Sequence, residues 1–87
     1  TYMKYAALEL AGKGIRCNAV QPGRINTPLI SNRLLSEEDV TKDIEQYPMK
    51  RYGKPEEVAH AIIYLLSDAS AWVTGTNLVI DGGRSLK

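Results

Sequence analysis

The 87-residue sequence is poor in the residues from which metal centres and disulfides are built. It has one cysteine, Cys17, which cannot form an internal disulfide, and one histidine, His60, which excludes a multi-histidine metal site. Its apolar runs last only a few residues, whereas a membrane-spanning helix needs about 20. No basic and then apolar signal segment opens the chain. We therefore expect a cytoplasmic protein with no metal and no membrane partner.

The sequence also lacks an excess of either charge. Eleven Lys and Arg against ten Asp and Glu leave a net charge of +1, which gives no electrostatic case for a nucleic-acid partner. Apolar residues make up 44% of the chain, a share typical of globular proteins. The length allows one small domain or part of a larger one.

Local patterns predict elements in the order helix, strand, helix, helix, strand. Helix formers without Gly or Pro indicate the first helix, and alternating apolar residues indicate the first strand. The second helix has the N-cap Ser36, and the third begins with Pro55 followed by two glutamates. The predicted ranges are a helix at 1–11, a strand at 15–20, helices at 36–46 and 55–67, and a strand at 77–80.

The strand–helix–strand order is that of a βαβ unit, which predicts two parallel strands. Two parallel strands make a poor sheet on their own, because parallel sheets are usually covered on both faces and contain more strands. The helix at 55–67 also carries an apolar face that needs a cover, formed by Val58, Ile62, Leu65 and Leu66. We therefore expect the chain to be the end of a larger α/β domain.

Three separated stretches resemble, in this order, the C-terminal third of the short-chain dehydrogenase/reductase family. They are LELAGKGIRCNAVQPGRINTP at residues 8–28, RYGKPEEVAHAIIYLLSD at 51–68 and ASAWVTGTNLVIDGG at 69–83. The resemblance implies an α/β fold in which the chain is the C-terminal βαβ portion of a Rossmann-like doubly wound parallel sheet. Residues 1–87 would then be one segment of a single NAD(P)-binding domain.

The resemblance also implies a place for each predicted element in that domain. The helix at 1–11 would be the end of the helix that carries the family's catalytic residues. The strands at 15–20 and 77–80 would be the sixth and the last strand. Between them, residues 22–50 would form a Pro-Gly loop and a substrate lid, and residues 55–67 the helix that follows.

The function implied by the resemblance is that of an NAD- or NADP-dependent oxidoreductase. Such an enzyme transfers a hydride between the nicotinamide and a carbonyl or alcohol carbon of a small molecule. In this family a homo-oligomer, either a tetramer or a dimer, is the rule. The alternative is a non-catalytic assembly module that pairs with a full-length relative.

The family's catalytic and phosphate-binding motifs are absent from this chain. It has no GxxxGxG loop and no Tyr-x-x-x-Lys pair, because Ala6 stands four residues after Tyr2 and Glu9 four residues after Tyr5. We therefore expect no catalytic residue in the chain and no activity from it alone.

The cofactor-binding residues implied by the resemblance lie in the Pro-Gly loop. Pro22 and Gly23 predict a rigid turn whose missing Cβ lets the backbone approach a flat ring closely. By analogy with the family, the backbone of Ile25 would pair with the nicotinamide carboxamide, and the hydroxyl of Thr27 would reach the carboxamide or the diphosphate. The other interpretation is an ordinary turn followed by the start of a helix.

The substrate lid implied by the resemblance contains Arg24, Leu29, Ile30 and Leu34. Arg24 could face a substrate carboxylate or phosphate, but we favour a solvated loop charge. The apolar residues, together with Leu35, could wall a substrate pocket or pack the lid onto the body of the domain. Both interpretations of the apolar residues stay open.

The remaining conspicuous residues receive structural interpretations. We expect His60 on an exposed helix surface, Cys17 as a small core residue and Trp72 as a packing anchor. Helix capping and a solvated face account for the acidic residues around the second helix, which are Glu37, Glu38, Asp39, Asp43 and Glu45.

Overall fold

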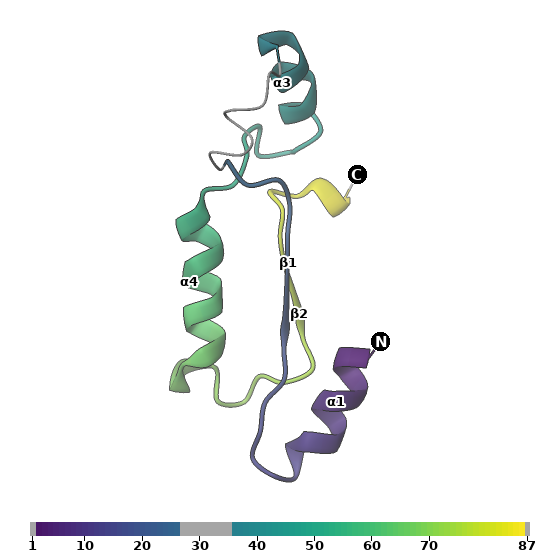
Figure 1. Cartoon of the computed structure of the whole chain (residues 1–87), viewed down its shortest axis with the longest axis vertical. Helices are drawn as coiled ribbons and strands as arrows, with labels where there is room; N and C mark the ends of the chain where they lie inside the picture. Colours follow the sequence, from purple (N-terminus) through teal and green to yellow (C-terminus); the bar gives the residue numbers. More distant parts are fainter. Residues whose placement is uncertain (1, 27–35, 87) are drawn as a thin grey trace.

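The structure, a computed structural model, describes residues 2–26 and 36–86. The two strands lie side by side at the centre of the molecule, with α4 along one side of them and α1 near their lower end (Figure 1). Within the described ranges the elements are, in order, α1 (Tyr2–Ala11), β1 (Ala19–Pro22), α3 (Glu37–Ile44), α4 (Pro55–Leu66), the 3-10 helix η1 (Asp68–Ser70), β2 (Asn77–Ile80) and the 3-10 helix η2 (Arg84–Leu86).

The strands β1 and β2 form the parallel pair that the sequence predicted. The predicted range of the first strand, 15–20, is wrong, because β1 begins at Ala19 and runs through Pro22. Proline is tolerated there because alternate residues donate across a parallel ladder. The Ala19 N–H donates to the carbonyl of Thr76, just before β2, and the Gly23 N–H donates to the carbonyl of Ile80 in β2, each at 2.9 Å. Pro22 therefore lies where no donor is needed.

The stretch before β1 stays outside the ladder because side chains replace some of its backbone partners, although the Gly75 N–H still donates to the Cys17 carbonyl at 2.8 Å. The Cys17 N–H donates to Thr74 Oγ1 at 3.1 Å, and the Thr76 N–H donates to Asn18 Oδ1 at 3.0 Å. Alternation of apolar residues cannot reveal such pairing, so the pattern at 15–20 predicted an extended segment correctly and its ladder incorrectly.

Helix α4 begins at Pro55, as predicted. The side chain of Glu57, in its first turn, caps the helix start. The Lys54 N–H donates to the Glu57 carboxylate at 2.8 Å, which satisfies a free amide at the helix start. The helix packs beside β1 and buries Leu65. Its other large apolar side chains stay more than 40% exposed, namely Ile62, Ile63, Tyr64 and Leu66.

Arg16 ties the C-terminal end of α4 to the stretch before β1. Its guanidinium donates to Ser70 Oγ at 3.0 Å and to the carbonyls of Val73 at 3.2 Å and Ser67 at 3.3 Å. Ser70 is only 1% exposed, and its hydroxyl donates in turn to the Leu65 carbonyl at 3.1 Å. A charged donor therefore meets the acceptors that a helix end leaves open.

Helix α3 has the predicted N-cap, since the Asp39 N–H donates to Ser36 Oγ at 3.1 Å. Its first turn is acidic, and negative side chains are favourable at the positive N-terminal end of a helix. The helix ends at Ile44 rather than at the predicted Gln46. No helix in the described ranges 2–26 and 36–86 combines the length and apolar character needed to cross a bilayer.

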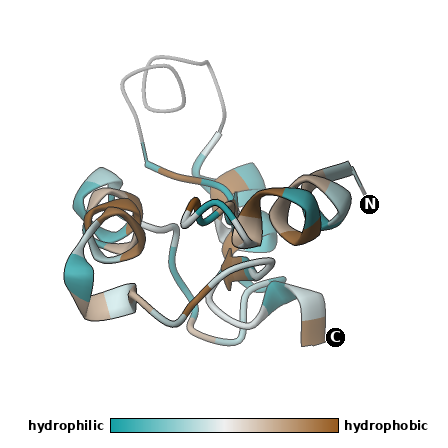
Figure 2. Cartoon of the chain, turned by 90° about the horizontal axis from the view of Figure 1, so that it is seen from below, coloured by the Kyte–Doolittle hydropathy of each residue, from teal (hydrophilic) through white to brown (hydrophobic). Residues whose placement is uncertain are grey.

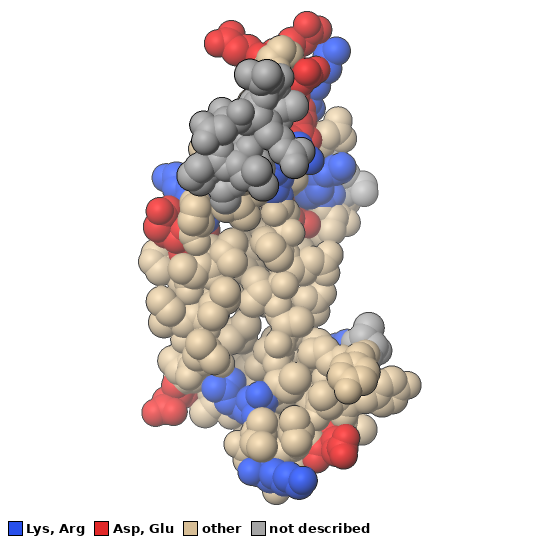
Figure 3. Space-filling model, in the orientation of Figure 1, with Lys and Arg blue, Asp and Glu red and all other residues tan. Residues whose placement is uncertain are grey.

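The molecule is elongated, with principal extents of 51 × 24 × 19 Å and a radius of gyration of 16.0 Å. A compact domain of this length has a radius of gyration of about 12 Å. The accessible surface is 6616 Å², against about 5,100 Å² for a compact protein of this mass. Figure 2 shows α4 and α1 on opposite sides of the strands, and Figure 3 shows an uncharged surface between the charged ends of the molecule. The described elements therefore leave much apolar surface uncovered.

Trp72 contradicts its predicted role as a packing anchor, because its side chain is 98% exposed. It follows η1 in a turn, and no described element covers it. His60 is exposed, as predicted, and Cys17 is half-buried.

Candidate functional site

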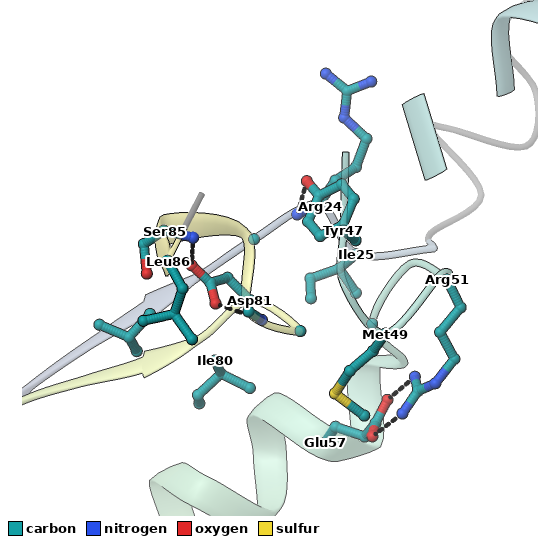
Figure 4. A pocket seen from close by; sticks show the side chains of 15 residues that line it. Arg24, Ile25, Tyr47, Met49, Arg51, Glu57, Ile80, Asp81, Ser85 and Leu86 are labelled. Carbon is teal, nitrogen blue, oxygen red and sulfur yellow. Dashed lines mark hydrogen bonds and ion pairs between the residues drawn. The ribbon is translucent and has the colours of Figure 1, made fainter. Parts of the chain in front are cut away.

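The carboxyl ends of β1 and β2 open onto a cavity of about 460 Å³. Its wall comes from the turn after β1, the turn after β2, the connector between α3 and α4, and the first turn of α4 (Figure 4). Crevices at the carboxyl ends of parallel strands are where open α/β sheets bind ligands. The geometry therefore makes this end of the sheet the candidate site.

Gly23, at the start of the first turn, is packed too closely for a side chain. A Cβ there would lie 3.0 Å from Tyr47 Cε1, 3.0 Å from Asp81 Cβ and 3.1 Å from Asp81 Cα. The last contact is with backbone, which cannot move aside cheaply. Gly23 is therefore packed against two neighbouring segments of this chain, and its predicted approach to a cofactor ring stays a prediction.

Ile25 forms an isolated parallel bridge with Gly53. The Gly53 N–H donates to the Arg24 carbonyl at 3.0 Å, and the Asn26 N–H donates to the Gly53 carbonyl at 2.8 Å. In such a bridge the peptide groups of the middle residue point away from the partner. Within residues 2–26 and 36–86, no hydrogen bond uses the N–H or C=O of Ile25. A donor and an acceptor are thus presented together by backbone that is fixed on both sides.

Tyr47 is the largest buried side chain of the site, at 7% exposure. Its hydroxyl accepts a hydrogen bond from the Arg24 N–H at 3.0 Å. Its ring meets the Tyr52 ring edge to face, with centroids 6.1 Å apart, and the Arg84 guanidinium lies 5.8 Å from its centroid. One aromatic ring therefore joins the turn after β1, the connector before α4 and the C-terminal segment.

The Arg24 side chain pairs with Asp43, whose Oδ2 lies 2.6 Å from Arg24 Nη1. The Tyr52 hydroxyl donates to the same carboxylate oxygen at 2.6 Å. The Tyr52 hydroxyl and then the Asp43 carboxylate raise the pKa of Arg24. Burial and then the bond to Asp43 raise the pKa of Tyr52, so its hydroxyl keeps its proton. This cluster binds α3 to the turn after β1.

A bidentate ion pair stands at the α4 side of the cavity. Arg51 Nη1 and Nη2 lie 2.6 and 2.8 Å from the two Glu57 oxygens. The hydrogen bond from Arg51 and then that from the Lys54 N–H lower the pKa of Glu57 from 4.5 to about 2.

Asp81 closes the opposite side of the cavity by holding the turn after β2. Its carboxylate accepts from the Gly83 N–H at 3.0 Å and from the Ser85 N–H at 2.9 Å. Burial would raise its pKa, but the hydrogen bonds from Ser85 and Gly83 outweigh burial and lower it. Asp81 therefore caps the turn after β2.

The structure brings three of the predicted cofactor-binding residues together, since Pro22, Gly23 and Ile25 follow one another at the end of β1. The predicted positions Thr27, Leu29, Ile30 and Leu34 lie outside the described residues. Arg24 is exposed, as favoured for a loop charge, and its side chain forms a surface ion pair with Asp43. Its guanidinium is directed away from the other labelled side chains of the cavity (Figure 4).

Sequence reasoning missed Tyr47, Tyr52 and the pairing of Asp43. Asp43 had been interpreted as part of a solvated face, but its carboxylate binds two side chains from other segments. Tyr47 was not singled out, since it lies just after the helix predicted at 36–46. The signal that could have found it is a large aromatic residue at the end of a polar helix, directly before proline.

Comparison with known proteins shows that the chain is similar to dehydrogenases and reductases. A family model described as enoyl-(acyl carrier protein) reductase matches residues 1–85. The chain is 46% identical over 84 residues to cyclohexanol dehydrogenase of Acinetobacter sp., covering 97% of this chain and 32% of that protein. It is 49% identical over 77 residues to the 3-oxoacyl-(acyl-carrier-protein) reductase FabG of Thermotoga maritima, covering 88% and 30%.

Solved structures agree with the sequence relatives. 4-Hydroxyisoleucine dehydrogenase complexed with NADH matches with a TM-score of 0.90 and 30% identity, over 99% of this chain and 35% of that one. The 3-oxoacyl-(acyl-carrier protein) reductase of Brucella melitensis matches with a TM-score of 0.87 and 38% identity, over 94% and 30%. The chain thus spans about a third of the length of the relatives it matches.

Proposed function

On the premise that the chain belongs to the short-chain dehydrogenase/reductase family, we propose that it forms the nicotinamide-side wall of an NAD- or NADP-dependent oxidoreductase. The polypeptide that carries it would interconvert a carbonyl and an alcohol on a small molecule. When bound, the cofactor supplies or accepts the hydride. This chain's residues bind and orient the nicotinamide, and the catalytic acid–base groups come from elsewhere in that polypeptide.

The observation that carries this proposal is the backbone of Ile25. A nicotinamide carboxamide has an NH₂ donor and a carbonyl acceptor on one rigid group, and Ile25 presents an acceptor and a donor that no described residue uses. The bridge to Gly53 fixes both neighbours of Ile25, so little conformational entropy is lost when a ligand binds. A relative that shares this fold has been solved with NADH, which supports the choice of cofactor class.

We also propose that the chain has no activity on its own. The uncovered side chains of α4 and the small core mean that further structure is needed around the sheet. We expect the 87 residues alone to show no turnover with NADH or NADPH. We also expect the whole enzyme to be a homo-oligomer.

The test uses the full polypeptide that carries this chain, with two variants at one position. Ile25→Val keeps both peptide groups and should bind NADH or NADPH as the unmodified protein does. Ile25→Pro removes the N–H and should weaken binding about tenfold, roughly the effect of one hydrogen bond plus an unpaired ligand group. Binding is measured by the fluorescence of the reduced nicotinamide, and circular dichroism confirms that both variants fold.

Two outcomes would contradict the proposal. If the unmodified protein binds neither nucleotide, the assembly-module alternative is favoured. If Ile25→Pro folds and binds as tightly as Ile25→Val, the backbone of Ile25 does not hold the carboxamide.

A further inference from the structure

We infer that Tyr47 is a positioning residue for the cofactor, acting through the backbone of Arg24 rather than by touching the ligand. The inference rests on the proposed function and adds a residue that the sequence did not single out. Tyr47 comes from the connector after α3, more than 20 residues along the chain from the turn that it contacts.

The first step of the argument is where the hydroxyl points. It accepts the Arg24 N–H at 3.0 Å, while the Arg24 carbonyl accepts from the Gly53 N–H at 3.0 Å. Both peptide groups of Arg24 are therefore held, one by a side chain and one by backbone. The Arg24 carbonyl shares its peptide group with the Ile25 N–H, so the bond from Gly53 directs that N–H. The bond to Tyr47 holds the preceding peptide group, between Gly23 and Arg24, and so fixes the backbone from which the Ile25 N–H is presented.

The second step is that packing holds the Tyr47 ring in place. Tyr47 is 7% exposed, and its Cε1 lies where a Cβ on Gly23 would come within 3.0 Å. The ring also lies beside Gly82, since a Cβ there would be 3.8 Å from its Cδ1. The turns after β1 and β2 therefore hold the ring between them, and a hydroxyl on a fixed ring is a fixed acceptor.

The third step separates this role from simple packing. Tyr52 is a second, half-buried tyrosine with its ring centroid 6.1 Å from that of Tyr47. Its hydroxyl bonds Asp43 and makes no contact with the backbone of the turn. The two hydroxyls are thus matched in chemistry and location. They differ in that the Tyr47 hydroxyl holds the backbone of the turn that presents Ile25, whereas the Tyr52 hydroxyl reaches the turn only through the Asp43 and Arg24 side chains.

The experiment compares Tyr47→Phe with Tyr52→Phe in the full polypeptide that carries this chain. Tyr47→Phe keeps the ring and loses the acceptor, so we expect the dissociation constant and the KM for the nicotinamide cofactor to rise about fivefold, the scale of one net hydrogen bond. The kcat at saturating cofactor should not change. Tyr52→Phe should leave cofactor binding unchanged, even if both variants lower the melting temperature.

A measurement on the unmodified protein needs no variant. Hydrogen exchange should show the Arg24 amide protected with and without NADH, and the Ile25 amide protected only when NADH is bound. Fast exchange at Arg24 in the free protein would overturn the inference.

The outcomes also separate this inference from the proposed function. If the unmodified protein binds neither NADH nor NADPH, the proposed function fails and the inference fails with it. If the unmodified protein binds and Tyr47→Phe binds equally tightly, or if Tyr52→Phe loses as much affinity, only the role of Tyr47 is wrong.

Discussion

Replacing Arg16 by methionine tests how much one half-buried guanidinium contributes to stability. The change keeps an apolar stem and removes hydrogen bonds to Ser70, Val73 and Ser67. A hydrogen bond to a charged group contributes about 1.5–3 kcal/mol, so three independent bonds would be worth more than 4 kcal/mol. That sum is too large for this site, because its acceptors have other partners.

Those other partners set the expected magnitude. The Ser67 carbonyl also accepts from the Ser70 N–H at 3.2 Å, and the Val73 carbonyl also accepts from Asn18 Nδ2 at 3.1 Å. Loss of Arg16 therefore strands no carbonyl, and the cost is close to that of one charge-assisted bond. We expect Arg16→Met to lower the free energy of unfolding by about 2 kcal/mol.

The matched control is Arg51→Met, which removes the same charge and also breaks short hydrogen bonds. Arg51 and Glu57 are 42% and 38% exposed, and exposed ion pairs contribute about 0.2–1 kcal/mol. The assay is urea denaturation of the full polypeptide, with equal slopes for the three proteins. If Arg16→Met falls within about 0.5 kcal/mol of the unmodified protein, the scale of a neutral surface change, or if Arg51→Met costs as much, the reasoning from burial is refuted.

Two further predictions concern the site. Gly23→Ala should destabilise the protein by about 1–3 kcal/mol, because its Cβ would press on Tyr47 and on the Asp81 backbone. Gly12→Ala, where a Cβ meets nothing within 4 Å, is the neutral control, and equal denaturation midpoints for the two variants would contradict the packing. The pKa of Glu57 is lowered from 4.5 to about 2 on folding, so the stability it contributes is complete above pH 4.5 and is lost as the pH falls toward 2. The difference in melting temperature between the unmodified protein and Glu57→Gln should therefore shrink over that range, and a difference independent of pH would show that the carboxylate is not held as described.

The elements that the sequence predicted well are those set by local chemistry. Ser36 and Pro55 mark helix starts through bonds and sterics within one turn, and both starts are found where expected. β2 at 77–80 also has its predicted range, because an apolar run bounded by turn residues marks a strand. The predicted range of β1 was wrong because ladder formation depends on the hydrogen bonds that residues 73–76, far along the chain, make with this segment.

The site was predictable only along one segment. Pro22, Gly23 and Ile25 lie together because they are consecutive with the end of a strand. Tyr47 reaches that segment from 23 residues away, and Gly53 does so through a bridge. No local pattern encodes such contacts. The prediction for Trp72 was wrong because a large apolar side chain suggests burial, whereas no described element covers this one.

The pairing of β1 with β2 also has a consequence for how the protein is made. Their first paired residues stand 58 positions apart, like Asn18 and Thr76. At about 5–20 residues per second of translation, β1 emerges roughly 3–12 s before the strand that completes this edge. During that interval its peptide groups on that edge are open to other nascent chains. Slower translation between the two strands should therefore increase misassembly, even though no native contact has changed.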